Sequence, residues 1–347
     1  MGEERRGNDF SHQRSDDLSR QLYDALIADF PSHAPGTRPV HAVGIGAVGY
    51  FVPSDVAHNF SCAEHFQGGR VDVTVRFSNS SGLPVEDDEA VDVRGMATKF
   101  HLKGGKAVDL IMNTLPVFFS RNAQDFLDIA VAGQPKPAKA ETLWSQLMDK
   151  LQLREPRPAP NPLSPYSGTA GVVSYVDVHR FARPGVIAAL GQVAPASYAR
   201  ATYHAIHTFK LTNADDKVRY CRLAWEPVAG GRPEDLSDLP NDYLHVELRE
   251  RLGRAPARFV LRMVVGNQGD ALDDPTKLWD TTRMRVVMGE IVLTGLAGHE
   301  GAGSERLSFN PTRVVQGFEG LDDRILAARA GAYEYSCMQR GGSGCPV

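Results

Sequence analysis

The chain has 347 residues, of which 42% are hydrophobic and 23% charged, an ordinary globular composition that allows one large core or two modest ones. A formal net charge of −4 argues against a nucleic-acid or anionic-membrane partner, and no apolar run is long enough to predict a transmembrane helix. No signal peptide is predicted, and four widely spaced cysteines without a C-x-x-C pair favour a cytoplasmic protein with reduced thiols.

The first predicted element is a capped amphipathic helix over residues 16–30, after a tail, residues 1–14, that we expect to be disordered. Strand-like segments follow, and several of them alternate apolar and polar side chains. In VDVTVRFS the valines and Phe77 face one way, whereas Arg76 and Ser78 share the other face. Eight strands that mostly follow one another predict an antiparallel barrel or a strongly curved sheet. The eight segments are 40–51, 71–78, 93–102, 107–113, 207–213, 217–226, 257–265 and 286–294.

Predicted helices complete an α+β fold. Helices and loops over residues 121–205 interrupt the strands after the fourth. This insert contains a proline-rich connector, residues 153–165, which we interpret as a stiff surface segment. Two further helices are predicted over residues 238–253 and 322–340.

Two short motifs suggest other chemistry, and we discount both. GIGAVG (44–49) matches the dinucleotide fingerprint G-x-G-x-x-G, but that fingerprint requires a helix directly after it. The β-prone YFVP follows instead, so glycines in a bent strand are the preferred interpretation. HAIH (204–207) has the spacing of a zinc-binding pair, but no Glu follows the first His and the motif continues into a predicted strand.

The C-terminal helix RILAARAGAYEYSCMQRGG (324–342) carries an unusual face. An amphipathic helix normally turns an apolar stripe toward the core, whereas this one presents two guanidiniums and a phenol along one line. Cys337 on the same line is interpreted as a small packed residue. The residues that share the face are Arg329, Tyr333, Cys337 and Arg340.

Seven segments, taken together, resemble the haem catalases, and they occur in the family's order over roughly residues 36–340. The resemblance implies an α+β fold with a catalase-like eight-stranded antiparallel β-barrel and surrounding helices. It also implies one haem-binding domain over residues 36–347, preceded by an N-terminal tail and helix over residues 1–35. The matching segments are RPVHAVGIGAVGYF (38–51), VRFSNSSG (75–82), DVRGMATKF (92–100), DLIMNTLPVFFSRNAQDF (109–126), HTFKL (207–211), DDPTKLW (273–279) and the R-x-x-x-Y of the C-terminal helix.

On the proximal side the resemblance implies that Tyr333 is the ligand to the ferric iron of a haem b. A phenol oxygen binds iron best as the anion, and the positive charge of Arg329 one turn away favours that form. Arg38, Arg76 and Arg340 are expected to bind the haem propionates, because arginine pairs well with carboxylates. A cofactor would therefore explain the polar helix face.

On the distal side the resemblance implies that His41 is the acid–base catalyst and that Asn113 donates a hydrogen bond beside it. An imidazole can take a proton from the bound peroxide oxygen and return it to the oxygen that leaves. Ser78 is placed to orient the imidazole, and Val40 and Phe126 are expected to narrow the pocket.

The favoured function is a haem peroxidase that reduces organic hydroperoxides and hydrogen peroxide with a small organic electron donor and has weak catalase activity. Three different functions remain open: a hydroperoxide isomerase or lyase of the allene-oxide-synthase type, a compact true catalase, and a haem carrier or sensor without activity. Val40 favours the peroxide-splitting members, since the isomerase branch commonly has Thr before the distal His. The oligomeric state is left open, with a homodimer as one arrangement.

Two departures from the large catalases lead to further expectations. The chain ends about fourteen residues after Tyr333 and lacks a long N-terminal arm, so the short catalase-related peroxidase branch without a C-terminal helical domain is expected. The family's nicotinamide site lies largely against that helical domain, so no bound NADPH is expected. A shorter access route to the haem should also favour bulky donors and organic hydroperoxides.

Overall fold

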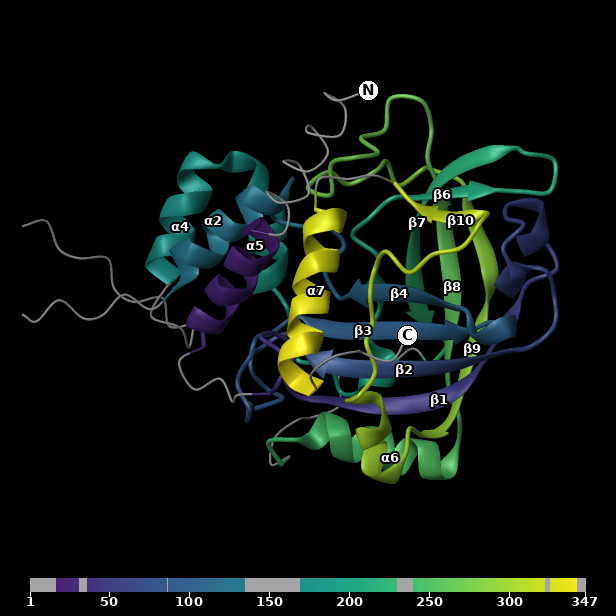
Figure 1. The fold of residues 1–347 in the computed structure, drawn as a ribbon, viewed down its shortest axis with the longest axis horizontal. Coiled ribbons are helices and arrows are strands. Elements are labelled where there is room, and N and C mark those ends of the chain that lie inside the picture. Colours follow the sequence, from purple (N-terminus) through teal and green to yellow (C-terminus); the bar gives the residue numbers. More distant parts are fainter. Residues whose placement is uncertain are drawn as a thin grey trace, which may run out of the picture.

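The structure, a computed structural model, describes residues 17–30, 36–85, 87–134, 169–229, 240–321 and 325–341 (Figure 1). The tail that we expected to be disordered and the proline-rich connector lie outside these residues. Antiparallel strands form the centre of the fold. They are β1 (Gly44–Pro53), β2 (Val71–Asn79), β3 (Arg94–His101), β4 (Ala107–Asn113), β5 (Tyr203–His204), β6 (Phe209–Thr212), β7 (Val218–Pro227), β8 (Ala257–Val265), β9 (Arg285–Leu296) and β10 (Phe318–Gly320).

Eight of these strands form a closed barrel. β1 to β4 follow one another as antiparallel neighbours, β5 joins β4 to β7, and β7 pairs with β8. The ring closes where β8 pairs with β9 and β9 pairs with β1. Closure leaves no free edge in the ring, which removes the liability of unpaired backbone groups. The predicted eight-stranded antiparallel barrel is therefore confirmed.

One strand of the ring differs from the prediction. The predicted segment 207–213 forms β6, which pairs with β7 and β10 beside the ring. The ring is completed by β5, which consists of only Tyr203 and His204 and lies inside the predicted helical insert. Two residues are too few to show a period of two in the sequence, so this strand could not be predicted from alternation.

The first strand begins later than predicted. It starts at Gly44 instead of residue 40, and His41 lies before it with a positive φ of 56°. Within the strand, a Cβ on Gly49 would lie 2.0 Å from the carbonyl oxygen of Val292, at a register shift between β1 and β9. The glycines of GIGAVG therefore belong to a bent strand, and the interpretation that excluded a dinucleotide loop is confirmed.

The barrel interior contains the apolar face predicted for VDVTVRFS. Val73, Val75 and Phe77 are all buried in the main hydrophobic cluster. Aromatic rings fill the centre, for example Phe51 and Phe100, whose centroids lie 5.3 Å apart in an edge-to-face arrangement. Burying each large apolar side chain contributes about 1.5–3 kcal/mol, so the interior alone stabilises the barrel. The outward side chains of the same strands are free to build a site.

Helices surround the barrel and are unevenly distributed (Figure 1). Helix 17–28, α2, α4 and α5 gather at one side, α6 covers another, and α7 runs across the face of β2, β3 and β4. No helix of the described residues is long and apolar enough to cross a membrane. The labelled helices are α2 (Ala123–Gly133), α4 (Thr169–Val178), α5 (Arg183–Leu190), α6 (Tyr243–Arg254) and α7 (Leu326–Gly341). Short 3₁₀ turns are η1 (Ala57–Asn59), η2 (Glu64–Phe66), η3 (Lys103–Gly105), η4 (Arg180–Ala182), η5 (Tyr198–Arg200) and η6 (His299–Ser304).

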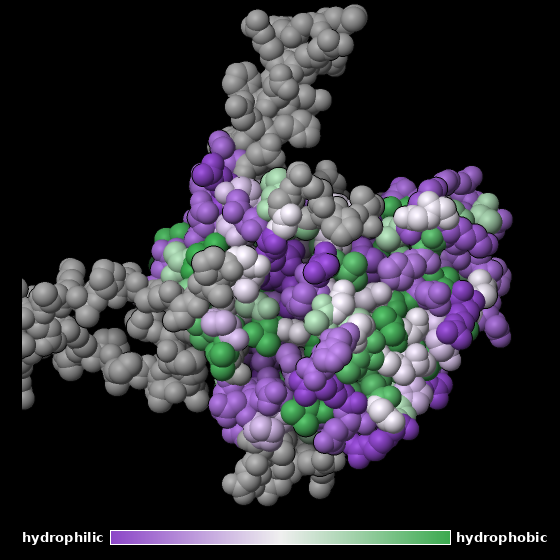
Figure 2. Space-filling view, turned by 60° about the horizontal axis from the view of Figure 1, so that its bottom comes forward, coloured by the Kyte–Doolittle hydropathy of each residue, from purple (hydrophilic) through white to green (hydrophobic). Residues whose placement is uncertain are grey.

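Helix 17–28 packs closely on α7. A Cβ on Gly331 would lie 2.4 Å from Ser19 Oγ, so only glycine allows this approach. The rings of Tyr23 and Tyr335 meet edge to face with centroids 4.8 Å apart. Elsewhere hydrophilic residues cover most of the face shown in Figure 2, with smaller hydrophobic groups between them. The close packing of the two helices places helix 17–28 directly beside α7.

Candidate functional site

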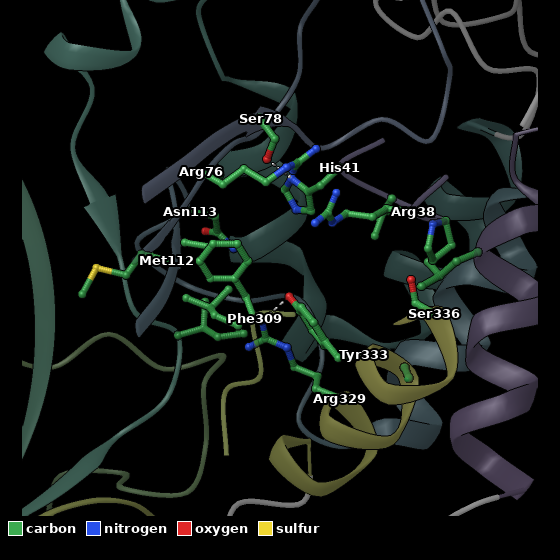
Figure 3. Close-up of a pocket in the computed structure, with 18 of the residues that line it drawn as sticks. Arg38, His41, Arg76, Ser78, Met112, Asn113, Phe309, Arg329, Tyr333 and Ser336 are labelled. Carbon is green, nitrogen blue, oxygen red and sulfur yellow. Dashed lines mark hydrogen bonds between the residues drawn. The ribbon is translucent and has the colours of Figure 1, made fainter. Parts of the chain in front are cut away.

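A cavity lies between the outward face of β2–β4 and α7. The strand side supplies His41 and Asn113, and the helix side supplies Tyr333 and Arg329 across the open space (Figure 3). Every site residue predicted from the sequence lines this cavity. These residues are Arg38, Val40, His41, Arg76, Ser78, Asn113, Phe126, Arg329, Tyr333 and Arg340.

The strand side of the cavity is built from a row of residues in register. Gly44 pairs with Ser78, Ser78 with Gly95, and Gly95 with Asn113 across four consecutive strands. Residues in register across a sheet point to the same side, so Ser78 and Asn113 both face the cavity, with a glycine between them. The register therefore fixes the spacing of the two polar side chains.

The His41 side chain is held over this row. Its Nδ1 lies 2.9 Å from Ser78 Oγ, and its backbone N–H donates to the carbonyl oxygen of Ser80 at 3.0 Å. A Cβ on Gly95 would lie 2.9 Å from His41 Cε1, so glycine is required for the imidazole to lie flat on the sheet. The left-handed backbone at His41 is a strained conformation for a residue with a side chain, and such conformations cluster at functional sites.

Burial and positive neighbours set the protonation state of His41. Burial lowers the pKa of its imidazole to about 3, with Arg76 and Arg329 acting in the same direction. The ring is therefore neutral at every pH at which the protein would normally work.

Asn113 is oriented by the main chain. Its Oδ1 accepts a hydrogen bond from the N–H of Leu115 at 2.9 Å. The amide NH₂ is thereby turned away from that loop, and it is the part of the side chain able to donate into the cavity. The hydrogen bond from the backbone of Leu115 therefore orients the NH₂ group of Asn113 toward a ligand in the cavity.

On the helix side, Arg329 bridges two groups. Its Nη2 donates to the Tyr333 oxygen at 3.4 Å, while its Nη1 lies 2.5 Å from His207 Nε2. His207 is buried at the start of the HTFKL segment. Sequence analysis identified that segment as a motif but gave His207 no role, because its partner is 122 residues away.

Three arginines converge on one glutamate at the edge of the cavity. Glu305 binds Arg38 Nη1 at 2.5 Å through Oε2 and Arg76 Nε at 2.7 Å through Oε1. The Glu305 carbonyl oxygen accepts from Arg38 at 3.3 Å and from Arg340 at 3.5 Å. Burial raises the pKa of Glu305, but Arg76 and Arg38 outweigh it and leave a net lowering. The three arginines and Glu305 together carry a net charge of +2.

The polar face of α7 differs from the predicted one in a single residue. Ser336 lines the cavity, whereas Cys337 is buried beside it and is not among the lining residues. Positions 329, 333, 336 and 340 follow the helical repeat more closely than positions 329, 333, 337 and 340. Cys337 is also disulfide-bonded, which corrects the expectation of reduced thiols throughout, although Cys62 and Cys221 are free.

Apolar side chains form the rest of the lining. Leu22 and Leu26 come from helix 17–28, Ile206 precedes HTFKL, and Phe118 and Phe126 lie just before α2 and within it. Sequence analysis predicted only Phe126 among these. The contribution of helix 17–28 could not be seen in the sequence, because its docking depends on the close approach to Gly331.

The described residues offer no conventional metal cluster. No group of three or more His, Cys, Asp or Glu side chains within them could hold a metal ion. The discounted zinc pair at 204–207 therefore gains no support. A metal in this cavity would need most of its ligands from a cofactor.

Comparisons with known proteins agree with the fold. Residues 20–156 match the family model described as catalase. The chain is 31% identical to a catalase-related peroxidase from Mycolicibacterium paratuberculosis, covering 89% of this chain and 90% of that one. A catalase-related peroxidase from Synechococcus elongatus is 28% identical over 88% of this chain and 84% of its own length. Catalase-2 of Bacillus subtilis is 28% identical over 85% of this chain and 42% of its own length. The crystal structure of a fungal catalase shares the fold, with a TM-score of 0.71 at 22% identity, and covers 90% of this chain and 61% of that one.

Proposed function

The chain belongs to the catalase superfamily, in its short catalase-related peroxidase branch, and from this membership we propose that it is a haem peroxidase. Its proposed substrates are organic hydroperoxides and hydrogen peroxide, with a small organic molecule as electron donor and weak catalase activity. The observation that carries the proposal is a cavity with a neutral imidazole on one side and a phenol on the other.

The residues around the cavity fit a haem b. The surplus of two positive charges around Glu305 matches the two propionates of the cofactor, and apolar side chains surround the rest of the space. Tyr333 would bind the iron through its oxygen, to which the adjacent Arg329 guanidinium donates a hydrogen bond at 3.4 Å. When bound, the haem iron supplies the redox chemistry that cleaves the peroxide O–O bond.

The strand-side residues would manage the proton. With Nδ1–H donating to Ser78 Oγ, His41 presents an unprotonated Nε2 to the cavity, where it can accept a proton from a peroxide. The Asn113 amide can donate a hydrogen bond to the second peroxide oxygen as negative charge develops there. The two side chains thereby act on different atoms of the same substrate.

The low basicity of His41 suits proton return. A group whose pKa is held near 3 by burial gives up a borrowed proton readily. The leaving oxygen therefore receives the proton from His41 instead of from solvent.

The lining also supports the choice of substrate. Leu22, Leu26, Ile206 and Phe309 give the cavity an apolar wall beside its few polar groups. An apolar wall binds the hydrocarbon part of an organic hydroperoxide but contributes nothing to binding of hydrogen peroxide. We therefore propose organic hydroperoxides as the better substrates.

Haem-loaded protein tests the proposal directly. Apoprotein with one equivalent of haem is mixed with hydrogen peroxide or cumene hydroperoxide, and oxygen release and oxidation of a bulky phenol are followed together. We expect phenol oxidation to exceed oxygen release, and His41→Ala to abolish most of both. Oxygen release that dominates with every peroxide would instead identify a compact true catalase.

The same assay distinguishes a peroxidase from an isomerase and from a haem carrier. An isomerase or lyase would convert a fatty-acid hydroperoxide without consuming the phenol. A haem carrier or sensor would bind the cofactor and turn over neither peroxide, with or without His41.

A further inference from the structure

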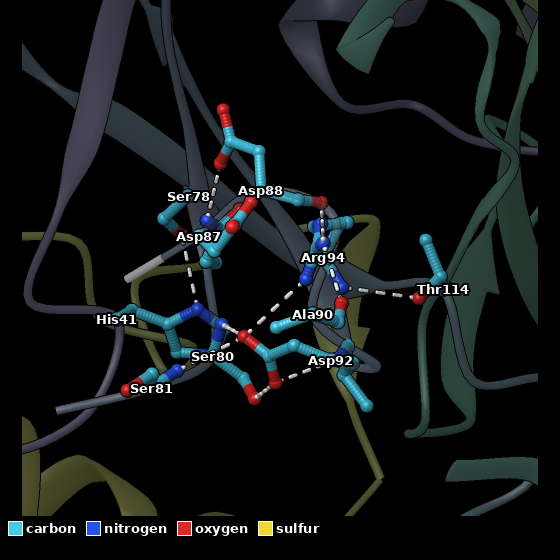
Figure 4. A network of polar contacts seen from close by, with 12 residues as sticks. His41, Ser78, Ser80, Ser81, Asp87, Asp88, Ala90, Asp92, Arg94 and Thr114 are labelled. Atoms are coloured by element: carbon cyan, nitrogen blue, oxygen red, sulfur yellow. Dashed lines mark hydrogen bonds and ion pairs between the residues drawn. The ribbon is translucent and has the colours of Figure 1, made fainter. Parts of the chain in front are cut away.

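A buried polar network lies directly behind His41 (Figure 4). Its centre is the carboxylate of Asp92, in the loop that connects β2 and β3. Oδ2 accepts the backbone N–H of Ser80 at 2.6 Å and that of Ser81 at 3.2 Å. Oδ1 accepts the Ser80 hydroxyl and the backbone N–H of Val93. The three hydrogen bonds from Ser80 and Ser81 fasten that short segment to Asp92, just before β3.

That segment holds the backbone at His41. The carbonyl oxygen of Ser80 accepts the N–H of His41, and the carbonyl oxygen of Ser81 accepts the N–H of Ala42, both at 3.0 Å. These two bonds lie outside the β1–β2 ladder and tie the chain before β1 to the chain after β2, across the residue whose φ is 56°. The imidazole hydrogen-bonds to the Ser78 hydroxyl at 2.9 Å and to the backbone of Asn79. Both partners lie in β2, so the ring direction depends on how the backbone at His41 is held against that strand.

Arg94 completes the network on the side away from His41. It is 1% exposed and lies 3.4 Å from the Asp92 carboxylate. Its Nη2 also donates to the carbonyl oxygens of Asp88 at 2.7 Å and Ala90 at 3.0 Å. Arg94 thus compensates the largely buried charge of Asp92, and its bonds to Asp88 and Ala90 hold the loop that carries Asp92.

We propose that Asp92 is a positioning residue for His41: through Ser80 and Ser81 it holds the left-handed backbone that aims the imidazole into the cavity. Strained conformations persist only where the surroundings over-determine them, and three hydrogen bonds from Ser80 and Ser81 to one carboxylate contribute that restraint. Asp92 is not among the residues that line the cavity, so it acts through His41 and not on a ligand. The inference rests on the proposed function, since it concerns the group that would accept the proton.

Asparagine is a stringent substitution for Asp92. Both carboxylate oxygens accept backbone N–H groups, so a side-chain amide at this position would turn its own NH₂ toward a donor in either orientation. Asp88 provides a matched control in the same loop. It is also buried, and it accepts the Asn79 amide at 2.7 Å and the N–H of Leu244 at 2.8 Å, so it ties the loop to α6 and to the end of β2, and makes no bond to Ser80 or Ser81.

The test measures hydrogen cyanide binding to haem-loaded protein by stopped-flow absorbance. Hydrogen cyanide must lose its proton to a nearby base before it binds ferric iron, so the association rate reports whether an imidazole is aimed at the site. We expect Asp92→Asn to lower this rate by about 10- to 100-fold, since a misplacement of about 1 Å can cost a hundredfold. Asp88→Asn should lower the melting temperature by a similar amount and leave the association rate within about twofold of wild type.

The outcomes are distinct. An unchanged cyanide rate in Asp92→Asn, or equal losses in both variants, would overturn the proposal and leave Asp92 as a stability residue. If Asp92→Asn does not fold, Ser80→Ala removes one contact only and should still slow cyanide binding, by about threefold for a lost hydrogen bond of roughly 0.7 kcal/mol. No change in that variant would equally overturn the idea. Failure of the wild-type protein to bind haem would count against the proposed function instead.

Discussion

The two sides of the cavity are built in different ways. On the strand side, the register of four neighbouring strands aligns Ser78, Gly95 and Asn113, and backbone groups orient His41 and Asn113. On the helix side, Arg329, Tyr333 and Arg340 share one face of α7 by helical period alone. Their partners, His207 and Glu305, come from distant parts of the chain. One side is therefore positioned by main-chain geometry, and the other by side-chain contacts.

The difference has a chemical counterpart. Proton transfer requires donor and acceptor within a narrow distance, which a sheet register supplies with little freedom. A cofactor's affinity and electron density respond to charge, which long arginine side chains can supply from several directions. Substitutions on the strand side should therefore alter rates, whereas those on the helix side should alter affinity and potential.

The largest expected effect concerns the strand side. His41→Ala should lower the rate of the first reaction with peroxide by about 10²–10⁴-fold, because the proton acceptor is lost. Asn113→Ala removes one neutral donor and should cost less. Stopped-flow absorbance at increasing peroxide concentration measures both rates. A greater loss in Asn113→Ala than in His41→Ala would contradict the assignment of roles.

Gly95→Ala adds a methyl group between Ser78 and Asn113, the polar residues in register on the strand side, without removing any polar group. The new methyl group would lie 2.9 Å from His41 Cε1, and relieving such a contact typically costs about 1–3 kcal/mol. We expect the first-step rate to fall by roughly 5- to 100-fold with haem affinity unchanged. Gly253→Ala, in α6 with no atom close to the added methyl group, is the control and should behave as wild type. A parallel loss of haem in Gly95→Ala would show that the two sides are not independent.

The sequence predicted the two sides unequally well. Periods of two and of 3.6 residues located most strands, α7 and its polar face, because those periods are local, whereas the roles of His41 and Asn113 came from the resemblance to the haem catalases. Glu305, His207 and the leucines of helix 17–28 were missed, since their places depend on contacts with residues far away in the chain. Glu305 is 267 residues from Arg38. The backbone conformation of His41 was missed as well, because the strand was expected to begin before it.

On the helix side, Arg329→Leu should leave haem bound but lower its reduction potential. The guanidinium that donates to the Tyr333 oxygen is lost, and the loss of this positive charge beside the iron favours the ferric state. Each tenfold gain in preference for the oxidised state lowers the potential by about 60 mV. Arg340→Leu, on the same face but directed at Glu305, should weaken haem binding instead. Redox titration of both variants measures the contrast, and an unchanged potential in Arg329→Leu would contradict it.

The smallest effect on the reaction concerns the barrel interior, which has no part in the chemistry. His65 is 1% exposed among Phe66 and Phe100, and burial lowers its pKa to about 3. Below about pH 6.5 the His65 imidazole takes up a proton in the unfolded chain but not in the folded protein. The free energy of unfolding therefore decreases as pH falls from about 6.5 toward 3. The loss attributable to this histidine is about 1.4 kcal/mol for each pH unit.

Urea unfolding of the apoprotein at a series of pH values between neutral and mildly acidic measures this dependence. His65→Phe should have a shallower decline of unfolding free energy with falling pH, whereas His58→Gln, at an exposed position, should follow wild type. Equal slopes in all three proteins would show that the buried imidazole gains its proton without unfolding.

The central claim is that the polar face of α7 binds a haem through Tyr333, opposite a strand-built proton acceptor. The most direct measurement is a titration of apoprotein with haem, followed by absorbance and electron paramagnetic resonance, in wild type, Tyr333→Phe and Tyr335→Phe. Tyr335 lies on the same helix but packs against Tyr23, so it controls for loss of a tyrosine. We predict one haem per chain with a phenolate-to-iron charge-transfer band in wild type and Tyr335→Phe, and loss of that band with weaker binding in Tyr333→Phe. An identical spectrum and affinity in Tyr333→Phe would contradict the claim.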